Sequence, residues 1–359
     1  MFRSSRLIAV TLLALAALLA LAGCATAAPS AATQAPAPTQ AQAATQAPAP
    51  TQAQAATEPA PTQPSQVTQA AMTIGLAVHS NPAEDLFWGV VAKGAEDAAN
   101  TYGITLKSGG SGDPKEQAQL IETYVADQVD GIIVSMANPD ALKDAIAKAT
   151  AAGIPVITIN SGGDRSKEFG ALAHVGQEEN VAGNGAGLKF KEAGAKKVLC
   201  VIHEEGNVGL EARCDGLNET LGGEVVRFNV ATTGVKDVRG TTTAIQDKLT
   251  SDPTIDGVLA LNPVVGIAAL DAVKAAGGSQ KVATFDLSPD VLTALENDEM
   301  LFAIDQQQYL QGYLPVVMLY LYKTNLNTVG GGLPVLTGPG FVTKENAAQV
   351  KDLSAKGTR

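Results

Sequence analysis

Polar residues follow several apolar runs of the sequence, at the point where each run ends. The polar residues placed in this way are Ser135, Asn160, Ser161, Asn262, Asp286, Asp305 and Gln306. Amide and carboxylate groups supply paired donors and acceptors, which suits a small, neutral ligand rich in neighbouring hydroxyl groups. Each residue also has a local explanation, because Asn, Asp and Ser cap helices and form turns, and Asp305 reads equally well as a cap. Their shared placement favours one common cleft over a set of separate caps.

Two adjacent aromatic residues, Phe87 and Trp88, follow a polar loop that contains Asp85. The loop comes after the apolar run at 74–78 and before an amphipathic stretch, so the order predicts a strand, a loop and a helix. Rings at such a junction belong either to the core or to a platform for the apolar face of a ligand. The polar residues at the ends of the apolar runs favour the platform over the core. Arg213 would add a planar guanidinium with several N–H donors to the site. Alternatively, Arg213 is a solvent-exposed charge on a helix.

The elements that must position these residues alternate between strand and helix from Met72 onward. Near-continuous apolar runs, typical of strands covered on both faces, predict strands at 74–78, 104–108, 131–135, 155–160, 172–176, 197–202, 225–230, 257–261, 281–285 and 301–304. Helices are predicted at 88–102, 114–127, 140–152, 180–193, 209–221, 237–250, 266–276, 288–297 and 308–324. This predicts an α/β fold of two doubly wound, Rossmann-like lobes with parallel sheets, divided near residue 176.

The first 71 residues predict export followed by a tether. Arg3 and Arg6 precede an apolar run at 7–22, which is short for a membrane span of about 20 residues. The sequence Leu-Ala-Gly before Cys24 resembles the bacterial lipoprotein lipobox. The lipobox implies a signal peptide at 1–23, cleavage before Cys24 and lipid on its thiol; an ordinary signal peptide with an incidental cysteine is the alternative. Residues 24–71 contain almost only Ala, Pro, Thr, Gln and Ser, which predicts a disordered tether.

Composition and missing motifs narrow the class of function. A net charge of −11 argues against nucleic acid as a partner. The three histidines lack metal-ligand spacing, and neither a phosphate-binding loop nor a nucleophile elbow is found, so we expect no metal, no cofactor and no enzyme activity. Residues 183–187, Gly-Asn-Gly-Ala-Gly, are expected to serve helix packing. If Cys24 carries lipid, Cys200 and Cys214 remain either as a disulfide or as two buried thiols.

Six segments together resemble the ribose-type periplasmic sugar-binding proteins, the solute receptors of bacterial sugar ABC importers. The segments are DLFWGVVAKGAEDAA, DGIIVSMANPDAL, AGIPVITINS, ARCDG, DGVLALNPVVGIAAL and VATFDLSPD. The resemblance implies a type I binding-protein fold with an N-terminal lobe at 72–176 plus 308–337 and a C-terminal lobe at 177–307 plus 338–359, joined by three crossovers. It also implies a lipid-anchored extracytoplasmic monomer that delivers a monosaccharide or polyol to an ABC permease. A sensor that presents a sugar or furanone to a membrane receptor remains open. LacI-type repressors share this core fold, but they carry a basic DNA-reading helix before it, where this sequence has a predicted signal peptide.

The resemblance further implies which residues bind the ligand. They are Asp85, Phe87, Trp88, Ser135, Asn160, Ser161, Arg213, Asn262, Asp286 and Gln306. Ribose-type receptors commonly have Asp-Arg at the position of Asn160 and Ser161, and often Asn at Ser135. Ribose-type receptors also have an aromatic residue in the second lobe, and this sequence has none at the matching place, near Val235. Ribose is therefore not favoured, and a pyranose, fructose or a cyclitol such as inositol remains open.

Overall fold

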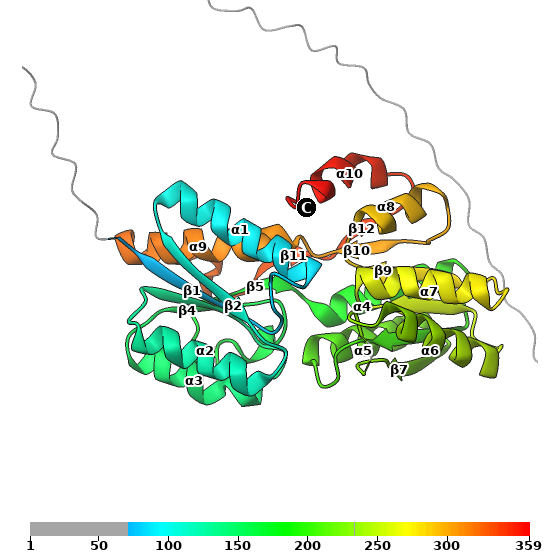
Figure 1. The fold of residues 1–359 in the computed structure, drawn as a ribbon, viewed down its shortest axis with the longest axis horizontal. Helices are drawn as coiled ribbons and strands as arrows, with labels where there is room; N and C mark the ends of the chain where they lie inside the picture. Colours follow the sequence, from blue (N-terminus) through cyan, green and yellow to red (C-terminus); the bar gives the residue numbers. More distant parts are fainter. Residues whose placement is uncertain (1–70, 233) are drawn as a thin grey trace, which may run out of the picture. The chain divides into compact units, whose positions relative to one another are not determined.

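The computed structural model describes residues 71–359 except residue 233. The predicted signal peptide, Cys24 and the tether apart from Ala71 lie outside the described residues. The first sheet contains β1 (Thr73–Val78), β2 (Thr105–Gly110), β3 (Gly131–Ser135), β4 (Val156–Ile159), β5 (Ala173–Gln177) and β11 (Val335–Gly338). The second sheet contains β6 (Lys197–Ile202), β7 (Glu224–Asn229), β8 (Gly257–Ala260), β9 (Lys281–Phe285), β10 (Ala303–Asp305) and β12 (Gly340–Val342). Each sheet, with its helices, forms one lobe (Figure 1).

The described part of the chain has ten α-helices, nine between these strands and one after the last strand. They are α1 (Leu86–Tyr102), α2 (Pro114–Ala126), α3 (Pro139–Ala151), α4 (Glu179–Glu192), α5 (Val208–Leu221), α6 (Val238–Ser251), α7 (Pro263–Ala275), α8 (Pro289–Glu296), α9 (Gln308–Asn325) and α10 (Ala347–Ala355). Two 3₁₀ turns, Gly163–Arg165 and Gly330–Gly332, complete the elements. Helices α1, α3, α4 and α7 are each followed closely by a glycine with positive φ, namely Gly103, Gly153, Gly194 and Gly277.

The two sheets have the same strand order, β11-β5-β4-β3-β1-β2 and β12-β10-β9-β8-β6-β7. The first five strands of each series pair in parallel, so β1 corresponds to β6, β4 to β9 and β5 to β10. The edge strands differ, because β11 is parallel to β5 whereas β12 is antiparallel to β10. The predicted pair of doubly wound lobes is confirmed.

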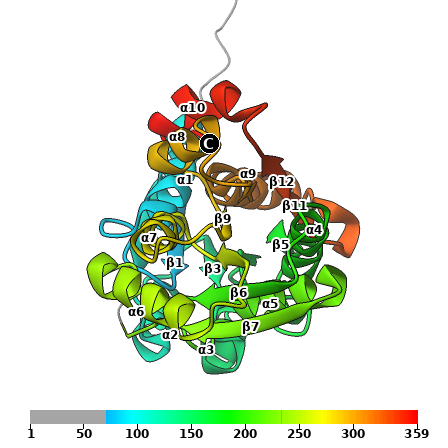
Figure 2. The same ribbon diagram turned by 90° about the vertical axis from the view of Figure 1, so that its right-hand side faces the viewer.

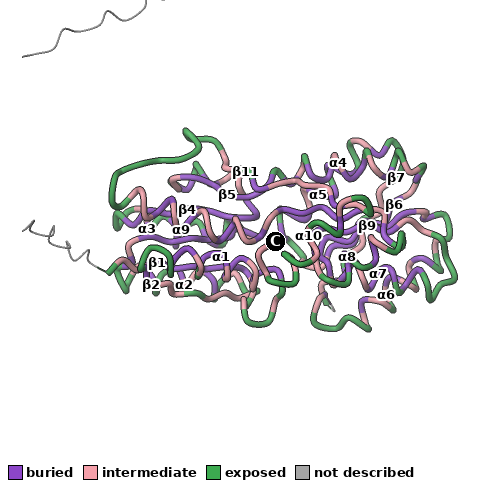
Figure 3. The backbone as a smooth tube through the Cα atoms, turned by 90° about the horizontal axis from the view of Figure 1, so that it is seen from above, coloured by how far each residue is buried: buried purple, intermediate pink, exposed green. Residues whose placement is uncertain are grey.

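Helices cover both faces of each sheet, which explains why the central strands are buried. In the first lobe α1 and α9 pack on one face and α2 and α3 on the other, each face with its own apolar cluster. In the second lobe α4 and α5 cover one face, and α6, α7 and α8 cover the other (Figure 2). Strands β3, β4 and β5 are fully buried, while the edge strand β2 is partly exposed (Figure 3).

Glycines bring the first helix of each lobe unusually close to the helix that follows a crossover. A Cβ added to Gly94 of α1 would lie 2.1 Å from the Tyr309 carbonyl oxygen on α9. In the second lobe, a Cβ added to Gly183 of α4 would lie 2.1 Å from the Arg213 carbonyl oxygen on α5. Only glycine permits this backbone contact. The prediction that the glycines at 183–187 serve helix packing is therefore confirmed.

The described chain passes between the sheets three times, after β5, β10 and β11. Helix α9 follows β10 of the second sheet, yet it packs on α1 of the first lobe. The carboxyl ends of β5 and β10 therefore lead directly into the crossovers. This arrangement places the residues that end those strands between the two lobes.

Candidate ligand-binding site

A cavity between the lobes collects most of the residues that the sequence singled out. Its empty space, which includes open solvent at the mouth, is about 350 Å³. The predicted residues that line it are Asp85, Phe87, Trp88, Asn160, Ser161, Arg213, Asn262, Asp286 and Gln306. Residues that line it without having been predicted are His79, His203, Glu204, Asn207, Leu210 and Leu261. The cavity lies at the carboxyl ends of strands from both sheets, the usual place for ligands in open α/β sheets.

Ser135, which ends β3, is the one predicted binding residue that does not line the cavity. It is fully buried, and its hydroxyl oxygen accepts a hydrogen bond of 3.0 Å from the His79 backbone N–H. The same oxygen lies 2.7 Å from His79 Nδ1. Because the hydroxyl already accepts from the backbone, its own proton is free to go to Nδ1. Ser135 therefore positions His79 from behind the cavity wall.

The two aromatic residues belong to the cavity wall and to the core of the first lobe at once. Asp85 caps α1, since its Oδ1 accepts from the backbone N–H of Phe87 at 2.9 Å. Trp88 is only 2% exposed, and its ring lies edge-on to Phe87 at 4.9 Å and to His79 at 4.6 Å between centroids. The core interpretation therefore holds, since both rings are buried in the first lobe, and the same rings also border the cavity.

A web of side-chain amides joins the two lobes beside the crossovers. Asn160 at the end of β4 donates through Nδ2 to Gln306 Oε1 at 3.0 Å and to Gln311 Oε1 at 3.3 Å. Gln306 in turn donates to Asp286 Oδ1 at 2.9 Å. The Ser161 hydroxyl donates to Asn160 Oδ1 at 2.9 Å. Since both Nδ2 hydrogens of Asn160 are used, its first role is to orient the neighbouring amides.

Asn160 and Asp286 occupy equivalent places, directly after β4 and β9, and both have left-handed backbone. Their φ values are 61° and 68°, a conformation that costs a residue with a Cβ about 1–2 kcal/mol. Burial raises the pKa of Asp286 to about 7, although Arg213 and the hydrogen bond from Gln306 act to lower it. Below that pH the carboxyl carries a proton and also donates. Above that pH the ionised carboxylate can only accept.

Arg213 on α5 is locked in place on three sides. Its Nε and Nη2 donate to the two oxygens of Glu179 at 2.6 and 3.1 Å, and Nη1 donates to the Leu261 carbonyl oxygen at 3.3 Å. The guanidinium also lies over the Phe285 ring, 4.3 Å from its centroid. Burial acts to lower the pKa of Arg213, but Glu179 outweighs it and keeps the group charged. The side chain is 96% buried, so the predicted alternative of a solvated helix charge is wrong.

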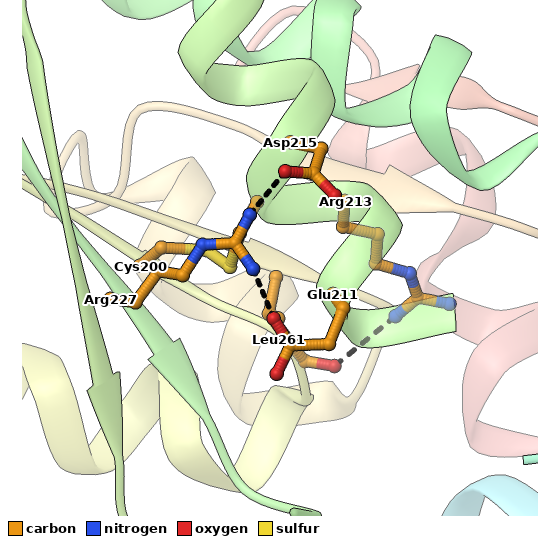
Figure 4. The surroundings of a disulfide bond; sticks show 7 residues. Cys200, Glu211, Arg213, Asp215, Arg227 and Leu261 are labelled. Carbon is orange, nitrogen blue, oxygen red and sulfur yellow. Dashed lines mark hydrogen bonds and ion pairs between the residues drawn. A yellow bond between two sulfur atoms is a disulfide. The ribbon is translucent and has the colours of Figure 1, made fainter. Parts of the chain in front are cut away.

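Helix α5 is itself fastened to the sheet behind it. Cys214 on this helix forms a disulfide with Cys200 of β6, which is one of the two alternatives left open by the sequence. On the next strand Arg227 contacts Glu211 and Asp215 of the same helix (Figure 4). These links fix the backbone that carries Arg213. The guanidinium of Arg213 points away from the Arg227 cluster, toward Leu261 (Figure 4).

The two histidines that the sequence analysis left out of the site, His79 and His203, follow β1 and β6, the equivalent first-sequence strands of the lobes. His79 Nε2 lies 3.6 Å from Glu204 Oε2, across the space between the lobes. Burial lowers the pKa of both histidines. Burial acts to raise the pKa of Glu204, but His79, His203, the hydrogen bond from Asn207 and Arg213 together lower it below its usual value. Both histidines follow apolar runs of the sequence, as the predicted site residues do; at His203 the sequence favours a lone hydrogen-bonded histidine over a ligand contact.

Among the described residues, several donor and acceptor groups on the cavity wall are not fully used by hydrogen bonds within the protein. Asn262 caps α7 through Oδ1, which leaves both of its amide hydrogens. Arg213 has five N–H groups and uses three, which leaves two. On the acceptor side, His203 Nδ1 has no partner and only one oxygen of Asp85 is engaged. Such a wall suits a ligand whose groups both donate and accept, as hydroxyls do.

Comparison with known proteins assigns this chain to a protein family. The periplasmic binding protein domain matches residues 74–325, which is most of the chain. The chain belongs to the periplasmic binding protein family. It is a type I member of the kind that binds sugars for ABC importers, as the sequence predicted. The binding protein is therefore extracytoplasmic, and its relatives are substrate-binding proteins and not enzymes.

Individual relatives of this binding protein are similar over much of its length. The ribose import binding protein RbsB of Bacillus subtilis is 27% identical over 67% of this chain and 78% of its own. The xylose/arabinose-binding protein XylF of Sulfolobus acidocaldarius is 26% identical over 63% of this chain, and the match spans 60% of that relative. A solved carbohydrate transporter from Acidothermus cellulolyticus, in complex with myo-inositol, is 43% identical with a TM-score of 0.78. That match covers 80% of this chain and 100% of the other.

Within residues 71–359, residue 233 aside, no cluster of His, Cys, Asp and Glu side chains has the arrangement of a metal site. None of the helices in this part of the binding protein has the length and apolar character needed to cross a membrane.

Proposed function

We propose that this binding protein captures a neutral polyol of monosaccharide size between its lobes, with a cyclitol such as myo-inositol as the foremost candidate, and delivers it to an ABC permease. The observation that carries this proposal is the wall of the cavity, where residues with open donors and acceptors line the same space as Phe87 and Trp88. Hydroxyl groups match the open atoms, and an apolar ring face matches the aromatic rings.

The choice of a cyclitol rests on two observations. The structure that is 43% identical to this chain contains myo-inositol. The positions of Asn160 and Ser161 lack the Asp-Arg pair of ribose-type receptors, and Asn160 is occupied by neighbouring amides. A ligand with hydroxyl groups around its whole ring matches the mixture of donors and acceptors described above.

We further propose that ligand binding favours a closed arrangement of the lobes, and that Cys24 carries the lipid that anchors the protein. Contacts such as those between Asn160 and Gln306, and between His79 and Glu204, support closure because they join the lobes beside the cavity. Sequence alone supports the anchor, through the Leu-Ala-Gly before Cys24.

Isothermal titration of the full chain tests the proposed ligand. The panel contains myo-inositol, ribose, xylose, arabinose, glucose and fructose. We expect the tightest binding for myo-inositol, with a change in the fluorescence of Trp88, the one tryptophan of the chain. Absence of binding to every neutral polyol refutes the proposal. Binding of a pentose in preference to inositol refutes the choice of a cyclitol but leaves the proposal of a polyol-binding protein standing.

A further inference from the structure

His203 carries a buried nitrogen that has no hydrogen-bond partner in the described part of the chain. The residue follows β6 and lines the cavity, and its side chain is 8% exposed. Its Nδ1 is buried and has no hydrogen-bond partner among residues 71–359, residue 233 aside. An unsatisfied buried group of this kind costs about 1–3 kcal/mol, so proteins rarely leave one without a purpose. Its place on the cavity wall indicates a partner that arrives with the ligand.

The surroundings of the ring decide whether Nδ1 donates or accepts. The other nitrogen, Nε2, lies 4.0 Å from Glu204 Oε1, and the negative carboxylate favours a proton on Nε2. Burial lowers the pKa of His203, which keeps the imidazole neutral. A neutral ring with its proton on Nε2 has a lone pair on Nδ1, so Nδ1 acts as an acceptor.

The equivalent histidine of the first lobe shows what a satisfied ring looks like in the same fold. His79 follows β1 as His203 follows β6, but the Ser135 hydroxyl lies 2.7 Å from its Nδ1. The second lobe has Leu261 where the corresponding strand ends, and among residues 71–359 other than residue 233 no hydroxyl bonds to His203 Nδ1. The two rings thus differ in one respect, which is that the protein fills the acceptor on His79 and leaves the acceptor on His203 open.

We infer that His203 Nδ1 accepts a hydrogen bond from a hydroxyl of the bound polyol and makes this residue a determinant of specificity. The inference rests on the proposed function and deepens it. A ligand must present an O–H donor at this point. A pyranose ring oxygen or a methyl ether, which can only accept, leaves two acceptors facing each other and is rejected.

Three substitutions of His203, titrated with myo-inositol, test this role. His203→Asn keeps a polar atom near the place of Nδ1, His203→Gln moves it toward Nε2, and His203→Phe keeps the ring without any acceptor. We expect His203→Phe and His203→Gln to weaken binding about ten- to hundredfold, and His203→Asn by less than about tenfold. Equal losses for Asn and Gln, or no loss for Phe, overturn the inference.

Thermal unfolding of the ligand-free variants separates recognition from structure. If Nδ1 is reserved for the ligand, His203→Phe removes an unsatisfied atom, and the melting temperature rises or stays constant while affinity falls. A residue with only a structural role would lower the melting temperature. O-methyl inositols provide the matching ligand series, because at least one methyl ether should lose affinity for the wild type and regain it in His203→Phe.

The outcome also separates this inference from the proposed function. If the wild type binds none of the polyols in the panel, the proposed function fails. The acceptor is then tested without ligand, by the ¹⁵N resonances of the His203 ring, where a proton on Nδ1 overturns the inference. If the wild type binds myo-inositol and all three variants bind it equally well, only the role of His203 fails.

Discussion

The two lobes share one topology, yet their contributions to the cavity differ in kind. At equivalent strand ends the first lobe has His79 and Asn160, and neighbouring side chains fill their hydrogen-bonding capacity. The second lobe has His203 and Asp286 at those places, together with Arg213. Here Nδ1 of His203 is open, the Asp286 pKa is raised to about 7, and two N–H groups of Arg213 remain.

The difference indicates a division of labour within a repeated fold. The first lobe supplies a finished surface of Phe87 and Trp88, whose backbone is fixed by Asp85. The second lobe holds polar groups in position by disulfide, ion pair and ring contact, but leaves atoms available. Changes to the second lobe should therefore affect binding more than stability, unless they leave a buried charge alone. The four predictions below test this comparison.

The largest effect is expected for Arg213→Met, which breaks the buried ion pair of the second lobe. Glu179 is left buried without its partner, and such losses cost about 3–5 kcal/mol of the free energy of unfolding. Urea denaturation measures this. The double variant Arg213→Met with Glu179→Met removes both charges and should recover most of the stability without recovering polyol binding. If the double variant is as unstable as the single one, the ion pair is not the cause.

The second prediction concerns pH and the Asp286→Asn variant. The pKa of Asp286 rises from 3.8 to about 7 on folding because of burial, so the folded protein binds the proton more tightly. The stability from this proton is fully present below pH 3.8 and is lost as pH rises through 7. Linkage places the loss at no more than about 4 kcal/mol.

Urea denaturation of the wild type and Asp286→Asn at pH 5 and pH 8 provides the measurement. The variant should gain stability relative to the wild type at the higher pH, because its amide never ionises. Subtracting the two profiles cancels the other titrating groups. An identical pH dependence in both proteins contradicts a raised pKa and places an ionised Asp286 at the site.

Trp88→Ala tests whether the first lobe combines wall and core in one residue. Removing a ring that is 2% exposed should cost about 3 kcal/mol of stability, at the low end for Trp→Ala because one side borders the cavity. Affinity for the polyol should fall as well. Trp88→Phe is the control and should retain most of both properties. Loss of affinity alone places the ring in the cleft only.

The smallest effect is expected for Ser135→Ala. The variant leaves the His79 backbone N–H and Nδ1 without their partner, which costs about 1 kcal/mol of stability. Because Ser135 does not line the cavity, polyol affinity should change less than in His203→Phe. Calorimetric titration and thermal unfolding measure the two quantities. A tenfold loss of affinity with unchanged stability restores Ser135 as a direct ligand contact.

Sequence patterns located the long elements well because those elements carry strong periodic signals. Strands β3, β6 and β9 begin and end at the predicted residues, since each is an apolar run bounded by polar residues. Helix α7 begins at Pro263, three residues earlier than predicted, because Asn262 caps it directly. The residues 335–342 were not predicted as strands, because Gly338, Pro339 and Gly340 interrupt runs of only three or four residues.

The candidate site was predictable in place but not in its internal bonding. The position of Asn160 after a strand follows from the sequence, whereas its bonds to Gln306 and Gln311 depend on pairs 146 and 151 residues apart. The role of Ser135 was likewise invisible, because β3 lies beside β1 only in the folded sheet. Local patterns specify which residues end a strand, and tertiary contacts decide which of their atoms remain free.

The placement of β11 has a consequence for the order in which the chain is synthesised. Every other strand of the first sheet is complete by residue 177, but its edge strand comes from Val335–Gly338 and its covering helix α9 from Gln308–Asn325. A ribosome has therefore made most of the second lobe before the first can close its sheet. Neither lobe corresponds to a continuous gene fragment, so a vector that expresses one alone must splice separate segments.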